Sequence, residues 1–223
     1  MIAVLAVATL ALTAFDGESS PPAVSRPAPL PVTSAPPDSQ VLATLGNLRI
    51  QSPVAQGGVT AIGFHGSAEG AHELKPVGPQ RNEGLLARLW RRITGASKTG
   101  LGWYQLSGGA LRTLDVGAVA GTDVYAPVDG TVVAIRDQIV SGNVVGSEIE
   151  LRPSSAPSLV VSIQNVRPDP ELTVGGNVAA GASKLGVVTS ISRYERQALA
   201  RYAAEDGNNV AIQVYPSATL GVP

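Results

Sequence analysis

Short runs of alternating apolar and polar residues dominate the chain after residue 40. The alternation is clearest in Leu48-Arg49-Ile50-Gln51 and Val59-Thr60-Ala61-Ile62, where one face of each run would point toward a core. Further short alternating or apolar runs span Trp103–Ile135, Val144–Leu151, Leu159–Val166, Leu185–Val188 and Val210–Val214. The pattern predicts a mainly β domain from about Val41 to Tyr215.

Two segments depart from this pattern and predict two short helices. In Asn82–Ile93 the apolar residues recur at helical spacing behind a capping Asn82, and Gly95 follows. The second segment, Ser192–Glu205, opens with the spacing of a capping box, in which the Ser192 hydroxyl and the Glu195 carboxylate satisfy backbone donors. Gly207 stands at the position that usually ends a helix.

The first 40 residues have a different composition. Residues 1–15 carry no charged side chain, and their apolar run is shorter than a transmembrane helix of about 20 residues but typical of a signal peptide. Residues 16–40 contain seven prolines among Ser, Ala and Thr, which predicts an extended, disordered linker. We expect an exported protein, in the cell envelope or outside the cell, with residues 1–15 as a signal or membrane anchor.

Composition narrows the class of protein. The net charge is −1, which gives no electrostatic footprint for nucleic acid, and the absence of cysteine excludes a disulfide framework. The 25 glycines and 17 prolines favour turns and short strands over a helical bundle.

The most informative motif is Gly121–Val132, which reads Gly-Thr-Asp-Val-Tyr-Ala-Pro-Val-Asp-Gly-Thr-Val. Asp129-Gly130 between apolar residues predicts a hairpin turn, because both residues tolerate positive φ. Together with the glycine-punctuated segment Leu172–Gly186, this motif resembles the lysostaphin/LytM-type peptidoglycan metalloendopeptidases. The resemblance runs from about Leu111 to Tyr215 and implies a LytM-like barrel-sandwich (duplicated hybrid) fold.

The pattern and the resemblance together predict the organisation of the chain. We expect a signal or anchor segment at 1–15, a Pro-rich linker at 16–40, a β-rich extension with one helix at 41–110, a LytM-like domain at 111–216, and a tail at 217–223.

The resemblance also implies where the chemistry of the family would lie. Family members bind zinc through His-x-x-x-Asp and the second histidine of His-x-His, and they use further catalytic histidines. Asp115 matches the aspartate, whereas Leu111, Asn165, Asn209 and Ala211 stand at the histidine positions. We expect these five residues to lie around one groove, as a vestigial site.

A catalytic zinc needs about three protein ligands and an open water position, which one carboxylate cannot provide. We therefore predict no catalytic residue, no metal and no cofactor, with zinc possible only at a relocated site. Asp115 is then expected to bond turn amides. The two histidines, His65 and His72, have no spacing typical of a metal pair. We expect His65 to cap or pack within its loop and His72 to lie on the surface.

These observations favour a non-catalytic cell-envelope protein that binds peptidoglycan, another glycan or an envelope protein, or that scaffolds wall hydrolases. Two alternatives remain open: an active zinc-dependent endopeptidase with a relocated metal site, and a structural or export-complex adaptor. In active members of the family a short loop precedes the last strand. The helix predicted at Ser192–Glu205 could therefore cover the old site, which favours the non-enzymatic alternatives.

Overall fold

The structure is a computed structural model that describes residues 40–66, 68–84 and 100–217. The prediction of a mainly β domain is confirmed. The strands are β1 (Val41–Leu45), β2 (Leu48–Gln51), β3 (Ile62–His65), β4 (Lys75–Pro76), β5 (Tyr104–Gln105), β6 (Thr113–Gly117), β7 (Asp123–Tyr125), β8 (Gly130–Val140), β9 (Asn143–Pro153), β10 (Leu159–Pro168), β11 (Asn177–Val178), β12 (Lys184–Val188) and β13 (Asn209–Pro216).

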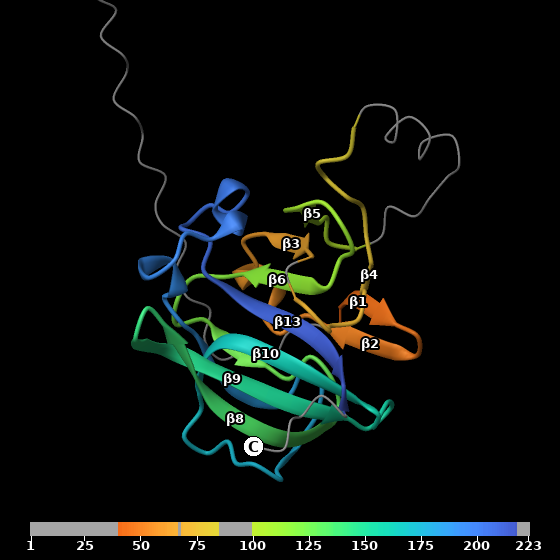
Figure 1. Cartoon of the computed structure of the whole chain (residues 1–223), viewed down its shortest axis with the longest axis vertical. Helices are drawn as coiled ribbons and strands as arrows, with labels where there is room; N and C mark the ends of the chain where they lie inside the picture. The colour runs from red at the N-terminus through yellow and green to blue at the C-terminus, as the bar shows by residue number, and fades with distance from the viewer. Residues whose placement is uncertain (1–39, 67, 85–99, 218–223) are drawn as a thin grey trace, which may run out of the picture.

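A large sheet forms the frame of the molecule. Its strands follow the order β11-β8-β9-β10-β13-β6-β3-β5, and β12 pairs with both β10 and β7. Figure 1 shows β8, β9, β10, β13 and β6 side by side. The pairs from β8 to β3 along this path are antiparallel, and β3 with β5 is parallel. Strands from the predicted extension at 41–110 therefore continue the sheet of the predicted LytM-like segment.

One hydrophobic core joins this sheet to a three-stranded sheet of order β2-β1-β4. Alternation places Leu114 and Val116 of β6 and Ile212 of β13 on the core face. Phe64 of β3 and Trp103 meet edge to face with their ring centroids 5.2 Å apart, which is a favourable aromatic geometry. The other face of the large sheet is therefore left to residues of opposite parity.

The hairpin predicted at Asp129-Gly130 is not formed. β7 pairs with β12, whereas β8 pairs with β9 and β11, so the two strands that flank this dipeptide belong to different ladders. Glycine is required at 130 for another reason, since a Cβ there would lie 2.3 Å from the carbonyl oxygen of Arg152. The hairpin instead joins β8 to β9 through Ser141 and Gly142, both at positive φ.

The prediction of a helix at Ser192–Glu205 is wrong. This segment holds two short 3-10 turns, η2 (Ile191–Arg193) and η3 (Ala198–Arg201), and Gln197 between them has an extended backbone. The predicted capping box is not formed, because the backbone N–H of Ser192 donates to Asn208 Oδ1 at 3.0 Å instead of to the Glu195 carboxylate. Tertiary contacts override the local helical preference here.

The other helix and the N-terminal predictions fall mainly on residues that are not described. Residues 85–93 of the helix predicted at Asn82–Ile93, residues 1–39 and residues 218–223 lie outside the described part of the chain. Residues 82–84 are not helical, and Asn82 bonds both backbone groups of Gln105 instead of capping a helix. In the described ranges the helical elements are 3-10 turns, η1 (Gln56–Gly58) being the third, and none is a membrane-spanning helix.

Candidate functional site

The cross-strand register places Asp115 and Ala211 side by side. Asp115 of β6 is directly opposite Ala211 of β13, and Ala211 is opposite Gln164 of β10. Residues directly opposite in neighbouring strands point to the same face of a sheet. These three residues therefore form a row on the face that is turned away from the Leu114 and Ile212 side of the sheet.

The row belongs to a broader polar face, a name we use for the residues of the same parity on six neighbouring strands. They are His65 on β3, Thr113 and Asp115 on β6, Asn209, Gln213 and Tyr215 on β13, Ser162 and Gln164 on β10, Glu148 and Glu150 on β9, and Arg136 on β8. Many of these side chains bond one another. Gln213 donates to Thr113 Oγ1 at 3.1 Å and accepts from the Tyr215 hydroxyl at 2.6 Å.

Asp115 is paired with a histidine that the sequence interpretation had placed within a loop. His65 lies at the end of β3, diagonally across from Asp115, and its Nε2 is 3.1 Å from Asp115 Oδ2. This hydrogen bond raises the pKa of the His65 imidazole above its ordinary 6.5, against the lowering effect of burial. The expectation that Asp115 bonds turn amides is therefore wrong, because Asp115 lies within a strand and its partner is His65.

Asn165 and Asn209 are also neighbours. Asn165 Nδ2 donates to Asn209 Oδ1 at 3.1 Å, across the β10–β13 ladder. Asn165 has φ +64°, a left-handed conformation that asparagine tolerates better than most residues, at an irregularity in β10. The Gln138 side chain bonds Asn165 twice. Its Nε2 donates to Asn165 Oδ1 at 2.9 Å, and its Oε1 accepts from the backbone N–H of Asn165 at 3.0 Å. Asn209 in turn donates to Gln197 Oε1 and to the Gly207 carbonyl.

Leu111 differs from the other four predicted groove residues. It precedes β6, its carbonyl accepts a hydrogen bond from the Leu74 N–H, and its side chain packs against the hydrophobic core. The structure thus gathers Asp115, Ala211, Asn165 and Asn209 on adjacent strands, and it gives Leu111 a packing role beside them.

The segment between β12 and β13 covers the Asp115 end of the polar face. Leu199 of η3 is fully buried, and its methyl carbons would lie 2.8 Å from a Cβ placed at either Gly63 or Gly117. Gly63 of β3 is directly opposite Asp115 of β6, and Gly117 lies two residues after Asp115 on β6. Both glycines therefore lie on the same face of the sheet as Asp115. Figure 1 shows this segment against the β3 and β6 end of the sheet.

This covering segment is fixed at several points. The Tyr202 ring stacks on Tyr104 with the centroids 4.1 Å apart, and the Thr60 hydroxyl donates to Glu205 Oε1 at 3.1 Å. Burial raises the pKa of the Glu205 carboxyl, and hydrogen bonds from Thr60, Gly207 and Asn208 partly offset that effect. The segment is therefore packed and bonded along its length.

The donor set at Asp115 does not fit a catalytic zinc. Ala211 stands directly opposite Asp115 and has no donor atom, and His65 and Asp115 supply only two ligands where about three are needed. In the ranges that the structure describes, no three side chains of His, Cys, Asp or Glu come together as a metal-binding group.

Two features of the site were missed by the sequence interpretation. His65 could have been found by extending the alternation of Val59–Ile62, since Ile62-Gly63-Phe64-His65 continues as a strand whose end reaches the Asp115 strand. Glu148 and Glu150 show the spacing of two carboxylates on one face of a strand. Which face they occupy depends on the register of β9, which the sequence pattern does not give.

Comparison with known proteins gives little support from sequence. No protein-family model matches the chain, and no curated protein matches it. Among solved structures, the chain is similar to a novel M23 metalloprotease, pseudoalterin, from the deep sea, with a TM-score of 0.32 and 18% identity. The similarity covers 50% of this chain and 58% of that one, so this chain spans less than two thirds of the length of that metalloprotease. A likeness of this size assigns no function to the chain.

Proposed function

We propose that this chain is a non-catalytic cell-envelope protein with a degenerate LytM-type domain that binds a cell-wall partner or glycan, or scaffolds wall hydrolases. The observation that carries this proposal is the replacement of donors around Asp115. Ala211 faces Asp115 across the ladder, and the two asparagines at the other histidine positions bond each other at 3.1 Å.

The chemistry follows from these contacts. Hydrolysis by this class of enzyme depends on a metal that lowers the pKa of a bound water to near 7. Asp115 is instead engaged by His65, and the amides of Asn165 and Asn209 are used in structural hydrogen bonds. An amide is also a poor zinc ligand, because zinc prefers imidazole, thiolate and carboxylate donors.

The covering segment supports the same conclusion by a different route. Leu199 lies over Gly63 and Gly117 beside Asp115, where a substrate peptide would have to approach the sheet. A binding role is compatible with this arrangement, since the exposed Arg136 and the half-buried Glu148 and Gln164 lie on the polar face beyond the covered end.

The test combines hydrolysis and binding in one preparation. The full chain is incubated with zinc and dye-labelled peptidoglycan, and both the released dye and the protein that sediments with the insoluble wall are measured. We expect no release above background and clear co-sedimentation, both unchanged in Asp115→Ala. Release that a chelator abolishes would contradict the proposal in favour of a relocated metal site. Absence of both release and binding would contradict wall binding and favour a scaffolding or adaptor role.

A further inference from the structure

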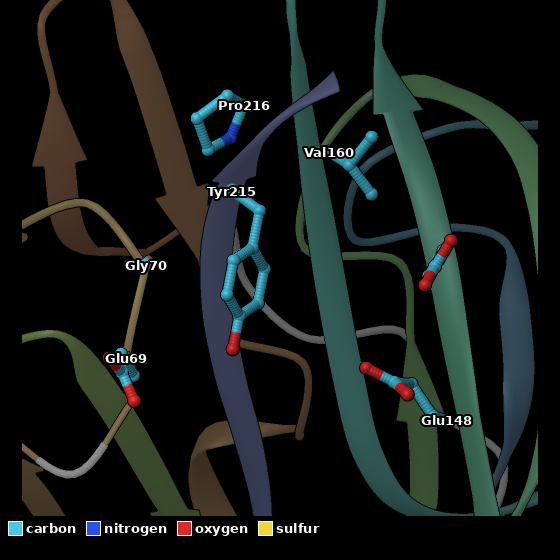
Figure 2. A pocket seen from close by; sticks show the side chains of 7 residues that line it. Glu69, Gly70, Glu148, Val160, Tyr215 and Pro216 are labelled. Atoms are coloured by element: carbon cyan, nitrogen blue, oxygen red, sulfur yellow. The ribbon is translucent and has the colours of Figure 1, made fainter. Parts of the chain in front are cut away.

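A cavity of about 300 Å³ opens at the end of the polar face that the β12–β13 segment does not cover. Figure 2 shows Tyr215 and Glu148 on neighbouring parts of its wall, with Glu69 approaching from the loop between β3 and β4. The lining residues are Glu69, Gly70, Glu148, Glu150, Val160, Tyr215 and Pro216. Three glutamates therefore line one cavity, although in the described ranges they are not close enough to form a metal-binding group.

Glu150 is the most unusual of these residues. Its side chain is only 8% exposed, and Arg136 binds one carboxylate oxygen, Oε1. The other oxygen, Oε2, is buried and has no hydrogen-bond partner in the described part of the chain. A buried carboxylate oxygen without a donor is costly, and it leaves negative charge beside the cavity that a bound cation would offset.

The surroundings of Glu150 make the cavity electrically negative. Glu148, two residues away on the same face of β9, accepts hydrogen bonds from Ser162 and Gln164 through Oε1. Burial raises the pKa of Glu150, and the Glu148 charge adds to this effect against the lowering effect of Arg136. Burial and the same Glu148 charge raise the pKa of the Tyr215 phenol. Arg136 offsets one of the three carboxylate charges, so the cavity keeps an excess of negative charge.

We propose that this cavity binds a primary ammonium group carried on a short alkyl chain, as in a lysine side chain. The proposal deepens the proposed function, and rests on it, by naming the chemistry that the binding face would recognise. The ammonium would donate to the Glu148 carboxylate and to the Tyr215 hydroxyl oxygen, whose own proton is given to Gln213, and the buried Glu150 carboxylate would add negative charge beside it.

An alkylammonium fits the cavity better than a metal ion does. About 300 Å³ far exceeds the space of one bare cation, and Val160 and Pro216 provide apolar wall against which a methylene chain would pack. The acidic residues also do not form a group of three metal-binding side chains anywhere in the described ranges.

The test titrates the full chain with Nα-acetyl-lysine amide and follows binding by calorimetry. The control ligand is the Nε-acetylated form, which keeps the shape and removes the charge. We expect binding of the first ligand only. Glu148→Gln and Glu150→Gln should each weaken it about tenfold, because each removes negative charge at the cavity, whereas the exposed Glu171→Gln should change it less than twofold. Equal binding of both ligands, or unchanged affinity in both cavity variants, would overturn the proposal.

Two further arms identify the source of the ammonium and separate this proposal from the proposed function. Cadaverine represents a free diamine, and peptidoglycan with intact or chemically acetylated amines represents the wall. Wall binding that is lost on acetylation and in Glu148→Gln assigns the ammonium to a wall peptide. Lysine-amide binding without wall binding would support the proposed ammonium site and contradict the wall-binding role. Wall binding without any ammonium binding would support the wall-binding role and contradict the proposed ammonium site.

Discussion

The two ends of the polar face differ in how completely their polar groups are satisfied. At the Asp115 end, His65 pairs with the aspartate, the two asparagines bond each other, and Leu199 lies over the adjacent glycines. At the Glu150 end, a buried carboxylate oxygen has no partner in the described chain, and a cavity of about 300 Å³ opens beside it.

This difference separates structural polar groups from binding groups on one continuous surface. Buried polar groups in folded proteins are nearly always hydrogen-bonded, and each exception needs an explanation. The Asp115 end needs none, because its contacts are internal and together hold β3, β6, β10 and β13 in register. The Glu150 end lacks such closure, and this is where the proposed ammonium would bind.

The largest expected effect is at the cover of the Asp115 end. Leu199→Ala should destabilise the fold by about 2–5 kcal/mol, because it removes a fully buried side chain and leaves a cavity over Gly63 and Gly117. Urea unfolding followed by fluorescence measures this change. Val174→Ala is the control, since Val174 is 60% exposed and should shift stability by less than about 0.5 kcal/mol. A loss below about 1 kcal/mol at Leu199 would mean that the segment is a loosely held lid.

The next effect tests whether the asparagines are structural. Asn209→Ala should cost about 2 kcal/mol, because it removes the partner of the buried Asn165 amide as well as its own bonds to Gln197 and Gly207. The measurement is again urea unfolding, with the exposed Asn143 at the start of β9 changed to Ala as the matched control. Unchanged stability in Asn209→Ala would point instead to a residue kept for ligand contact.

A smaller, pH-dependent effect is expected at His65. Its pKa is raised in the folded state, so the stabilising effect of the pair is complete below the unfolded value of about 6.5 and is lost as pH rises through the folded pKa. The free energy of unfolding of the wild type should exceed that of His65→Gln by about 1 kcal/mol at pH 5.5, and this difference should vanish at alkaline pH. Thermal melts across this range measure the gap, with His72→Gln as the control. A gap that widens with pH would mean that the imidazole is held neutral.

Much of the fold was open to prediction from the sequence, because alternation is a local signal. The runs at Leu48–Gln51, Val144–Leu151 and Val210–Val214 all fall on strands. The prediction of a hairpin at Asp129-Gly130 was wrong because a turn dipeptide does not reveal which strands pair. The flanking strands β7 and β8 belong to different ladders. The prediction of the second helix was wrong because tertiary contacts outweigh the local capping signals. Leu199 packs beside Gly63 and Gly117, and Asn208 accepts a hydrogen bond from the N–H of Ser192.

The candidate site was predictable only through its resemblance, and only in part. The resemblance brought Asp115, Asn165, Asn209 and Ala211 to neighbouring strands, which the register matches. Alternation could have placed His65 on a strand, but not opposite the Asp115 strand, because the pairing of β3 with β6 spans about 50 residues of chain. The cavity was beyond reach for the same reason, since Glu69 and Tyr215 come from distant segments.

The most direct test of the central claim is a thermal melt with and without a strong zinc chelator, run on wild type and on Asp115→Ala. A metal that binds only the folded state raises its stability by mass action, so a working zinc site would make the wild type sensitive to the chelator and the variant blind to it. We predict that each protein melts at the same temperature with and without chelator, with the variant lower by the loss of the His65 pair. A wild-type melting temperature that falls on chelation, in parallel with stoichiometric zinc in the purified protein, would contradict the account.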